Sequence, residues 1–400
     1  MRELLKFSIN KYVIFVILML LSAYPYIFDT ILGIPEEKIM NIVFFALSIV
    51  VFMSTSGKWM KYDIVNLSFV VQCVAWLFFS IYHRDSSYYT RIFFLVFTYI
   101  VLQILFRRQS VVKFGFAYNN IVTLQAVLGA VAFILVFVGV LPPLYEFARG
   151  GRIISFYGLT CTNITVGNFI RVAGFFDEPG ALASWGIFAL IINKIIYDNR
   201  KIELFLIISL FFTFSAAYFI LLPLYLLFFY RFNTKKIIIS LIVLIPLIFL
   251  GIKVLNDNEY FRWITIERFE GGEVRSKRMD YADEALIVFK KNISMGQGGR
   301  KLEEQFEGVN DNPYEILAKD GIIGYIITYL PLLLLCIKFR KNRNVLFGSL
   351  ILFICYQQRP FHINEMHHFM LYFYMMIIFC KFGKPSIETH YLEKYIKKNE

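Results

Sequence analysis

The chain has 400 residues, of which 58% are hydrophobic and 18% are charged, and its formal net charge at pH 7 is +12. Soluble domains are about 45–50% apolar and about 25% charged, so the composition argues against a soluble globular protein. The positive charge could indicate a nucleic-acid partner, but Lys and Arg gather in short connections between long apolar runs, which is typical of membrane proteins. We therefore expect no nucleic-acid partner. The five cysteines show neither a disulfide framework nor a metal-type spacing.

The apolar runs are long enough to cross a bilayer, because a hydrocarbon core of about 30 Å needs about 20 helical residues. Together they predict an all-α, polytopic integral membrane protein with about twelve transmembrane helices in a single membrane domain, 1–400. The first run follows several basic residues and lacks a clear cleavage site, so we interpret it as a retained signal anchor. The predicted spans are Tyr12–Phe28, Ile39–Ser54, Ile64–Tyr82, Thr90–Phe106, Ile121–Leu141, Ala181–Tyr197, a pair within Ile202–Tyr230, Ile237–Val254, Tyr314–Ile337, Val345–Tyr356 and Phe369–Cys380.

The apolar block Ile202–Tyr230 can be interpreted in two ways. Basic residues flank it on both sides, Lys201 before it and Arg231 after it, so both of its ends are expected in the cytoplasm. This favours two short helices that break near Ser215-Ala216, or a re-entrant pair. One long tilted helix is the alternative, and it would invert the orientation of everything that follows.

Two long polar segments, 142–180 and 253–313, interrupt the apolar runs. With the basic connections in the cytoplasm, both segments are predicted to be large external (periplasmic) loops, and the Lys-rich tail 381–400 is predicted to be cytoplasmic. Within the second loop, Met279–Lys291 carries apolar residues at helical spacing, which predicts an amphipathic helix.

The first loop ends in Arg171-Val-Ala-Gly-Phe-Phe-Asp-Glu-Pro-Gly180, directly before an apolar helix. Part of this pattern has a structural explanation, because Asp177 and Glu178 suit a helix start and Pro179-Gly180 supplies a turn. The functional alternative is a loop that its aromatic residues anchor to the helices and that directs the guanidinium of Arg171 at a group held at the membrane surface.

The second loop carries further candidates. Arg275, Lys277 and Arg278 form a basic cluster that is either a solvated face or a recognition site for phosphate or diphosphate, for which Arg offers a planar fork of donors. The glycine-rich run Gly296–Arg300 is either a flexible turn or a backbone nest for an anion. The stretch 310–314 suits a turn and helix cap or a part of the site. The last external turn is crowded with titratable groups whose spacing is too loose to define a metal ligand set: His362, Glu365, His367 and His368.

Several of these motifs occur together in a known order. Arg171-Val-Ala-Gly174 runs into Phe176-Asp-Glu-Pro-Gly180 before a helix. Later come Arg275 or Arg278, an amphipathic helix, Gly296-x-Gly298, and Asn312-Pro-Tyr-Glu-Ile-Leu-Ala-Lys-Asp-Gly321-Ile-Ile-Gly324. This order resembles bacterial polysaccharide polymerases of the O-antigen (Wzy) type and the related O-antigen ligases. The resemblance covers 170–330. Ligases usually have a His just before the Asn of the last motif, where this chain has Asn310 and Asp311, so the polymerase is favoured.

The resemblance implies a glycosyltransferase at the periplasmic face of the bacterial inner (cytoplasmic) membrane. The donor would be a growing glycan on undecaprenyl diphosphate, and the acceptor a lipid-linked repeat unit whose hydroxyl attacks the anomeric carbon. Arg171 with Arg275 or Arg278 would stabilise the charge of the leaving diphosphate, and Glu178 or Asp311 would accept the hydroxyl proton. Roles in binding substrate are expected for Arg275, Lys277, Asp177, Asn312, Tyr314 and Arg300.

No cofactor and no metal are expected for this reaction. The partners are the two lipid-linked substrates and the membrane lipids, and the sequence leaves open whether a chain-length regulator protein binds as well. Two alternatives remain, a ligase that moves finished glycan onto lipid A core and a transporter (flippase) of the lipid-linked unit. Polar residues within the spans are sparse and the charge lies in the two loops, which argues against the transporter.

Overall fold

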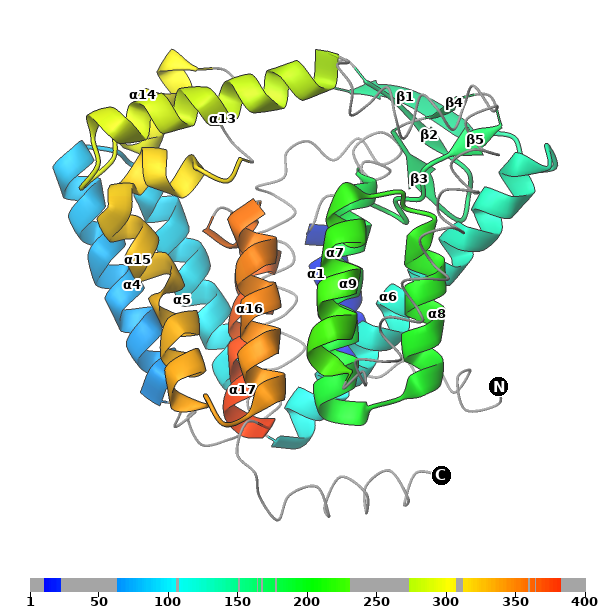
Figure 1. Ribbon diagram of the computed structural model, residues 1–400, viewed down its shortest axis with the longest axis horizontal. Helices are drawn as coiled ribbons and strands as arrows, with labels where there is room; N and C mark the ends of the chain where they lie inside the picture. Colours follow the sequence, from blue (N-terminus) through cyan, green and yellow to red (C-terminus); the bar gives the residue numbers. More distant parts are fainter. Residues whose placement is uncertain are drawn as a thin grey trace.

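The computed structural model describes residues 11–22, 63–105, 108–149, 152–163, 165–166, 168–176, 178–230, 273–306, 312–358, 360–363 and 365–382. Within these residues the chain forms a helical bundle with a small β-layer at one end (Figure 1). The helices are α1 Lys11–Ser22, α4 Asp63–His83, α5 Ser87–Leu105, α6 Arg108–Phe137, α7 Pro179–Ile192 with the π-helix η1 Asn193–Tyr197, α8 Arg200–Phe211, α9 Ala216–Phe229, α13 Glu273–Lys291, α14 Gly299–Gln305, α15 Glu315–Lys338, α16 Arg343–Gln358, the 3₁₀-helix η3 Phe361–Ile363, and α17 Met366–Phe382.

The connections between bundle helices gather at two ends (Figure 1). One end carries the strands, with α13 and α14 lying across it, and we call it the sheet end. At the opposite end, which we call the basic end, the helix connections are rich in Lys and Arg: Arg108, Arg200, Lys201, Lys338, Arg340, Lys341 and Arg343. The described parts of the two long polar segments, 142–180 and 253–313, therefore lie at the same end of the bundle.

A small β-layer occupies the first polar segment, which the expectation of an all-α fold missed. β1 Tyr145–Arg149 pairs antiparallel with β2 Arg152–Phe156, and β2 pairs with β3 Cys161–Thr162. A second ladder joins β4 Thr165–Val166 to β5 Phe169–Ile170. The sequence between β1 and β2 is Gly150-Gly151, a pair typical of hairpin turns.

The helices could span a membrane, but the expected count of about twelve spans is not confirmed. Among the described residues, four helical segments are long and apolar enough: Ile64–His83, Ser110–Phe137, Pro179–Tyr197 and Glu315–Lys338. Shorter apolar helices cover Lys11–Leu20, Ala216–Phe229 and Met366–Phe382. Helices such as α8, with 12 residues, reach only about 18 Å at 1.5 Å per residue, less than a hydrocarbon core of about 30 Å. The predicted spans Ile39–Ser54 and Ile237–Val254, and the tail 381–400 beyond Phe382, lie outside the described residues.

The block 202–230 forms two short helices, as predicted, rather than one long tilted helix. α8 ends at Phe211 and α9 begins at Ala216, so the break falls beside the predicted Ser215-Ala216 position. At the other end of α8, the side chain of Asn199 accepts hydrogen bonds from the first-turn amides of Lys201 and Ile202.

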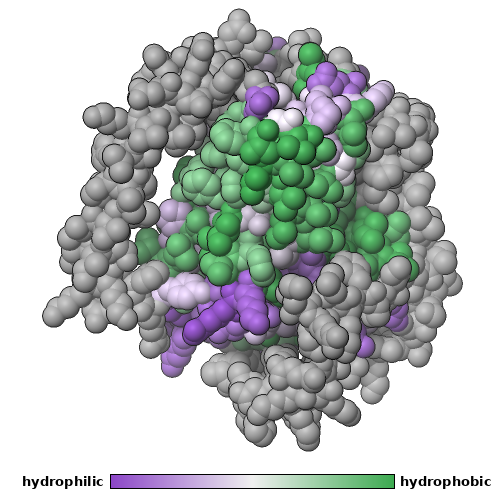
Figure 2. Space-filling view, turned by 90° about the vertical axis from the view of Figure 1, so that its right-hand side faces the viewer, coloured by the Kyte–Doolittle hydropathy of each residue, from purple (hydrophilic) through white to green (hydrophobic). Residues whose placement is uncertain are grey.

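The centre of the bundle is α17, in which every residue from Met366 to Cys380 is buried. A helix that is buried on all sides must be apolar all round, and α17 fits this apart from its two histidines at the sheet end. At the periphery, exposed apolar side chains of α6 and α8 form a band between hydrophilic ends, visible on one face in Figure 2. Such a band is the surface that lipid would cover: Val131, Ile134, Leu204, Phe205, Ile208 and Phe211.

Two predicted boundaries are revised or refined. The span predicted at Ile121–Leu141 is a helix that begins at Arg108, because its early apolar residues, Val111 and Phe114 among them, are buried against α1 and α17. The predicted amphipathic helix is confirmed as α13. Its buried side chains Ala285 and Val288 share a cluster with Leu302 of α14 and Ala318 of α15.

Candidate functional site

Arg171 is buried, with 3% of its surface exposed. Its Nε donates to the carbonyl oxygen of Thr213 at 3.2 Å, and its Nη2 donates to that of Phe214 at 2.9 Å. These carbonyls belong to the turn between α8 and α9, where a helix end leaves acceptors without intrahelical partners. The guanidinium therefore ties the first polar segment to this turn, which favours a positioning role for Arg171 over direct contact with a diphosphate.

The residues after Arg171 pair with the segment at the start of β3. Cys161 donates to the Gly174 carbonyl, Ala173 donates to that of Cys161, and the Gly174 amide donates to Thr160 Oγ1 at 2.9 Å. Gly174 has a φ of 63°, which favours glycine at this position. The aromatic anchoring predicted for this loop is present, because the Phe176 ring lies 5.1 Å from Trp185 of α7.

Glu178 occupies the N-cap position of α7, with Pro179 as the first helical residue. Its backbone is extended and its side chain makes no capping hydrogen bond, so the carboxylate is not used to satisfy the helix start. Since it is only partly buried, it stays eligible as the proton acceptor. The neighbouring Asp177 lies outside the described residues, as does Asp311, the other predicted base.

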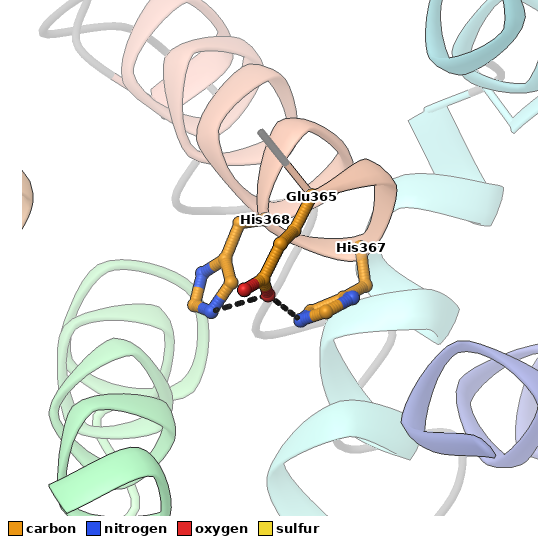
Figure 3. A group of neighbouring side chains, drawn as sticks. All are labelled: Glu365, His367 and His368. Carbon is orange, nitrogen blue, oxygen red and sulfur yellow. Dashed lines mark ion pairs between the residues drawn. The ribbon is translucent and has the colours of Figure 1, made fainter. Parts of the chain in front are cut away.

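Trp185 of α7 packs against both Phe176, from the segment that follows Arg171, and the histidines of α17. Its ring lies 5.7 Å from His367 and 5.9 Å from His368. Figure 3 shows the carboxylate of Glu365 between these two imidazoles; its Oε2 is 2.8 Å from His367 Nε2 and 3.9 Å from His368 Nε2. The turn before α17, whose spacing looked too loose in the sequence, thus brings three side chains of metal-ligating type together at the start of this helix.

A second imidazole environment lies next to this group. His362 of η3 is packed between Tyr356 and Tyr372, at ring distances of 4.3 and 4.9 Å. Neither of its ring nitrogens has a hydrogen-bond partner among the described residues. Burial lowers the pKa of His362 to about 3, so this imidazole is neutral at physiological pH.

A buried charge network surrounds the start of α15. Arg91 Nη1 is 2.8 Å from Asp320 Oδ2, and the hydroxyl of Tyr88 donates to the other carboxylate oxygen at 2.5 Å. Lys319 directly precedes Asp320, and its Nζ is 2.9 Å from Oε1 of Glu315, one helical turn earlier. All four charged side chains are at most 6% exposed. Ionisable groups paired in this way inside a helical bundle mark structural clamps or functional sites.

The glycine-rich run is neither a flexible turn nor an anion nest. The amides of Gln297 and Gly298 donate to the carbonyls of Ala318 and Lys319, both at 2.9 Å. In return the carbonyls of Ile293 and Ser294 accept from the amides of Ile322 and Ile323, which follow a break in α15 at Gly321 (φ 65°). The amides of this run that an anion would need are therefore used to hold the run against the break in α15. We call this backbone pairing between 293–298 and 318–323 the bracket.

Asp85, in the turn between α4 and α5, joins this turn to the bracket. Its carboxylate accepts from the Arg300 amide and the Ser87 amide, each at 2.8 Å. The guanidinium of Arg300 points elsewhere and pairs with Glu304 at 2.9 Å on an exposed surface. Asn312 accepts from the Tyr314 amide at 2.8 Å, the helix-start turn that the sequence suggested.

The basic cluster Arg275, Lys277 and Arg278 lies in the first turns of α13 at the sheet end; the structure describes their backbone but not their side chains. The same end carries β5 and the start of α7 (Figure 1), and Arg171 and Glu178 lie between these two elements in the chain. The structure thus brings the two predicted motifs to one end of the bundle, although no described contact joins their candidate residues.

Sequence analysis missed the buried network around Asp320 and the convergence of Glu365 with its two histidines. A signal for the first was present, because a lone Arg91 near the start of an apolar span requires a buried acid to pair with. The second depends on how the short turn before α17 folds, which residue spacing does not determine.

Comparison of the chain with protein-family models, with curated proteins and with solved structures finds no match.

Proposed function

We propose that the protein is a polymerase of lipid-linked polysaccharide repeat units, acting at the periplasmic face of the bacterial inner membrane. The observation that carries the proposal is the placement of both motif-bearing segments at one end of the bundle, opposite the connections rich in Lys and Arg. By the positive-inside rule, that arrangement corresponds to a periplasmic sheet end. An enzyme acting on two lipid-linked substrates needs its polar groups gathered in this way at one membrane surface.

The proposed reaction joins two lipid-linked glycans. A hydroxyl of the acceptor repeat unit attacks the anomeric carbon of the donor glycan, the bond from that carbon to the diphosphate oxygen breaks, and undecaprenyl diphosphate leaves with the negative charge. Arg278, with Arg275 and Lys277 beside it in α13, would stabilise this charge by electrostatics and hydrogen bonding. Glu178 would accept the hydroxyl proton.

The remaining candidates support the framework in this proposal. Arg171 keeps the first segment on the α8–α9 turn, so Glu178 is presented from a fixed helix start. The bracket between the glycine-rich run and α15 fixes the position of α13 through its packing on α15. Orientation of two bound substrates accounts for much of the rate enhancement in such reactions.

Incubation of the purified protein with a synthetic undecaprenyl-diphosphate repeat unit tests the proposal. A ladder of longer products, made without ATP or a nucleotide sugar, is the expected result. Transfer of a single unit only when lipid A core is added would instead establish the ligase. A substrate that stays single under both conditions would overturn glycosyl transfer and favour transport.

Variants then test the assigned roles. Arg278→Ala and Glu178→Gln are expected to abolish the ladder while the protein remains in the membrane at normal levels, and Gln keeps the size of the Glu178 side chain. Lys201→Ala, an exposed change at the basic end, is the matched control and should keep the ladder. Long chains from both Arg278→Ala and Glu178→Gln would show that the assigned mechanism is wrong.

A further inference from the structure

Glu365, His367 and His368 bring one ligand atom each into a small volume at the start of α17. The carboxylate oxygen and the two imidazole nitrogens all lie within 4.8 Å of one another. Glu365 Oε2 lies 2.8 Å from one Nε2 and 3.9 Å from the other. Ligands about 2.0–2.1 Å from a tetrahedral zinc ion are separated by about 3.3 Å, a value between these two distances. Small side-chain adjustments would therefore produce a coordination geometry.

The chemistry of the donor set fits a transition-metal ion. Two imidazoles and one carboxylate are the ligands of one class of zinc site that leaves a fourth position open, and imidazole prefers zinc and its neighbours to magnesium or calcium. His367 and His368 are 3% and 5% exposed, whereas the side chain of Glu365 is 27% exposed and provides access from the sheet end.

Two further observations concern the polar atoms around these three side chains. His367 Nδ1 and both ring nitrogens of the neighbouring His362 are buried without a hydrogen-bond partner among the described residues. Buried polar atoms are nearly always paired, so the region holds unsatisfied imidazole nitrogens, although an ion on the two Nε2 atoms would not itself pair these three. The second observation concerns orientation, because Tyr356 Oη lies 3.5 Å from His368 Nδ1. This contact lies on the opposite ring nitrogen from the one that faces Glu365, as in sites where an outer group orients a ligating histidine.

We propose that Glu365, His367 and His368 bind a divalent transition-metal ion, Zn²⁺ by preference, through Glu365 Oε2 and the two Nε2 atoms. The ion would fasten the start of α17 beneath Trp185, which packs on both histidines and on Phe176. This inference is independent of the proposed glycosyl transfer, since the glycosyl-transfer chemistry assigned above uses no metal, and either proposal can fail alone.

Metal binding is tested on the full chain, purified in detergent through a tag that contains no histidine and stripped with EDTA. Zn²⁺ is added back, excess ion is removed by gel filtration, and the retained zinc is measured by elemental analysis. One equivalent per chain is expected, together with a rise in melting temperature, because an ion that binds only the folded protein stabilises it. Substitution with Co²⁺ should give the visible absorption of a tetrahedral site.

Three variants assign the binding to these residues. Glu365→Gln and His368→Gln are expected to lose the retained zinc. His83→Gln changes a histidine that bonds the Met295 carbonyl elsewhere, and it should keep one equivalent. Tyr356→Phe retains the ring but removes the hydroxyl, and it is expected to weaken zinc binding about 10-fold.

Less than a tenth of an equivalent in the unmodified protein, with no Co²⁺ spectrum, would overturn the proposal. Equal zinc retention by the unmodified protein, Glu365→Gln and His368→Gln would also overturn it, because the ion would then be bound elsewhere. If a triad variant fails to fold, the Co²⁺ spectrum of the unmodified protein and the affinity of Tyr356→Phe decide the question.

Discussion

Asp320→Asn tests whether the buried charge network holds the start of α15 in place. Asp320 is 1% exposed and compensates the charge of Arg91, which is itself 5% exposed. Asparagine keeps the shape and can still accept from the Tyr88 hydroxyl, so the substitution removes mainly the negative charge. Removing one partner of a buried ion pair costs about 3–5 kcal/mol, because the other charge stays buried without compensation.

The double variant Arg91→Met/Asp320→Asn separates loss of the pair from an unspecific packing defect. If the cost arises from the uncompensated guanidinium, removing that group as well should recover most of the stability lost in Asp320→Asn. The assay is thermal unfolding in detergent at a fixed scan rate, followed by the reactivity of the free cysteines, several of which are buried in the folded protein. An unchanged melting temperature in Asp320→Asn, or a double variant as unstable as the sum of both single variants, would refute this reasoning.

Three further predictions concern the framework of the site, and thermal unfolding checks each of them. Gly296→Ala should destabilise the protein more than Gly139→Ala. Both glycines have a positive φ (69° and 75°). A Cβ added at Gly296 would collide with a backbone carbonyl of α15, whereas the atom nearest to a Cβ added at Gly139 is 3.6 Å away. Gly139→Ala measures the cost of left-handed backbone alone, about 1–2 kcal/mol, and equal losses in both variants would contradict the bracket. Burial raises the pKa of Asp85, but hydrogen bonds from backbone amides, the Arg300 amide first among them, outweigh burial and hold the pKa below its ordinary 3.8. A lowered carboxyl pKa contributes stability that is present above the ordinary pKa and is lost as the pH falls from there through the folded pKa. Asp85→Asn should therefore be less stable at neutral pH and lose less on acidification, and parallel acid profiles would contradict this. Arg171→Lys should lower the melting temperature, because one amine cannot replace both donors to the α8–α9 turn. A hydrogen bond from a charged group contributes about 1.5–3 kcal/mol to stability. An unchanged melting temperature would favour a direct role of Arg171 with the substrate.

Patterns that depend on local chemistry were predictable from the sequence. The bundle helices α4, α5, α7 and α15 lie close to the predicted spans, because each is a long apolar run bounded by polar residues. The break in 202–230 was predictable from the basic residues on both sides, which require an even number of crossings. The strands were missed because their residues lie in a polar segment, where the glycine pair between β1 and β2 was the only strong signal.

Features that depend on distant parts of the chain were not predictable. The run Gly296–Arg300 has the composition of a flexible turn, and only its pairing with α15 shows why glycine is needed there. In the sequence Arg171 resembles a cation available to a substrate, yet its guanidinium donates hydrogen bonds to a turn more than 40 residues away. Asp320 was part of a recognised motif, but its partner Arg91 lies 229 positions earlier in the chain.

Placement of both polar segments on the periplasmic face is the claim on which the proposed function depends, and cysteine labelling tests it most directly. Single cysteines at the exposed positions Thr165, Asp283, Lys201 and Arg340 would be treated in intact cells with a membrane-impermeant maleimide, with the unmodified protein as the background control. Thr165→Cys at the β-layer and Asp283→Cys in α13 should label in intact cells, whereas Lys201→Cys and Arg340→Cys at the basic end should label only after lysis. Labelling of Thr165→Cys and Asp283→Cys from opposite sides, or of both only after lysis, would contradict the proposed periplasmic site.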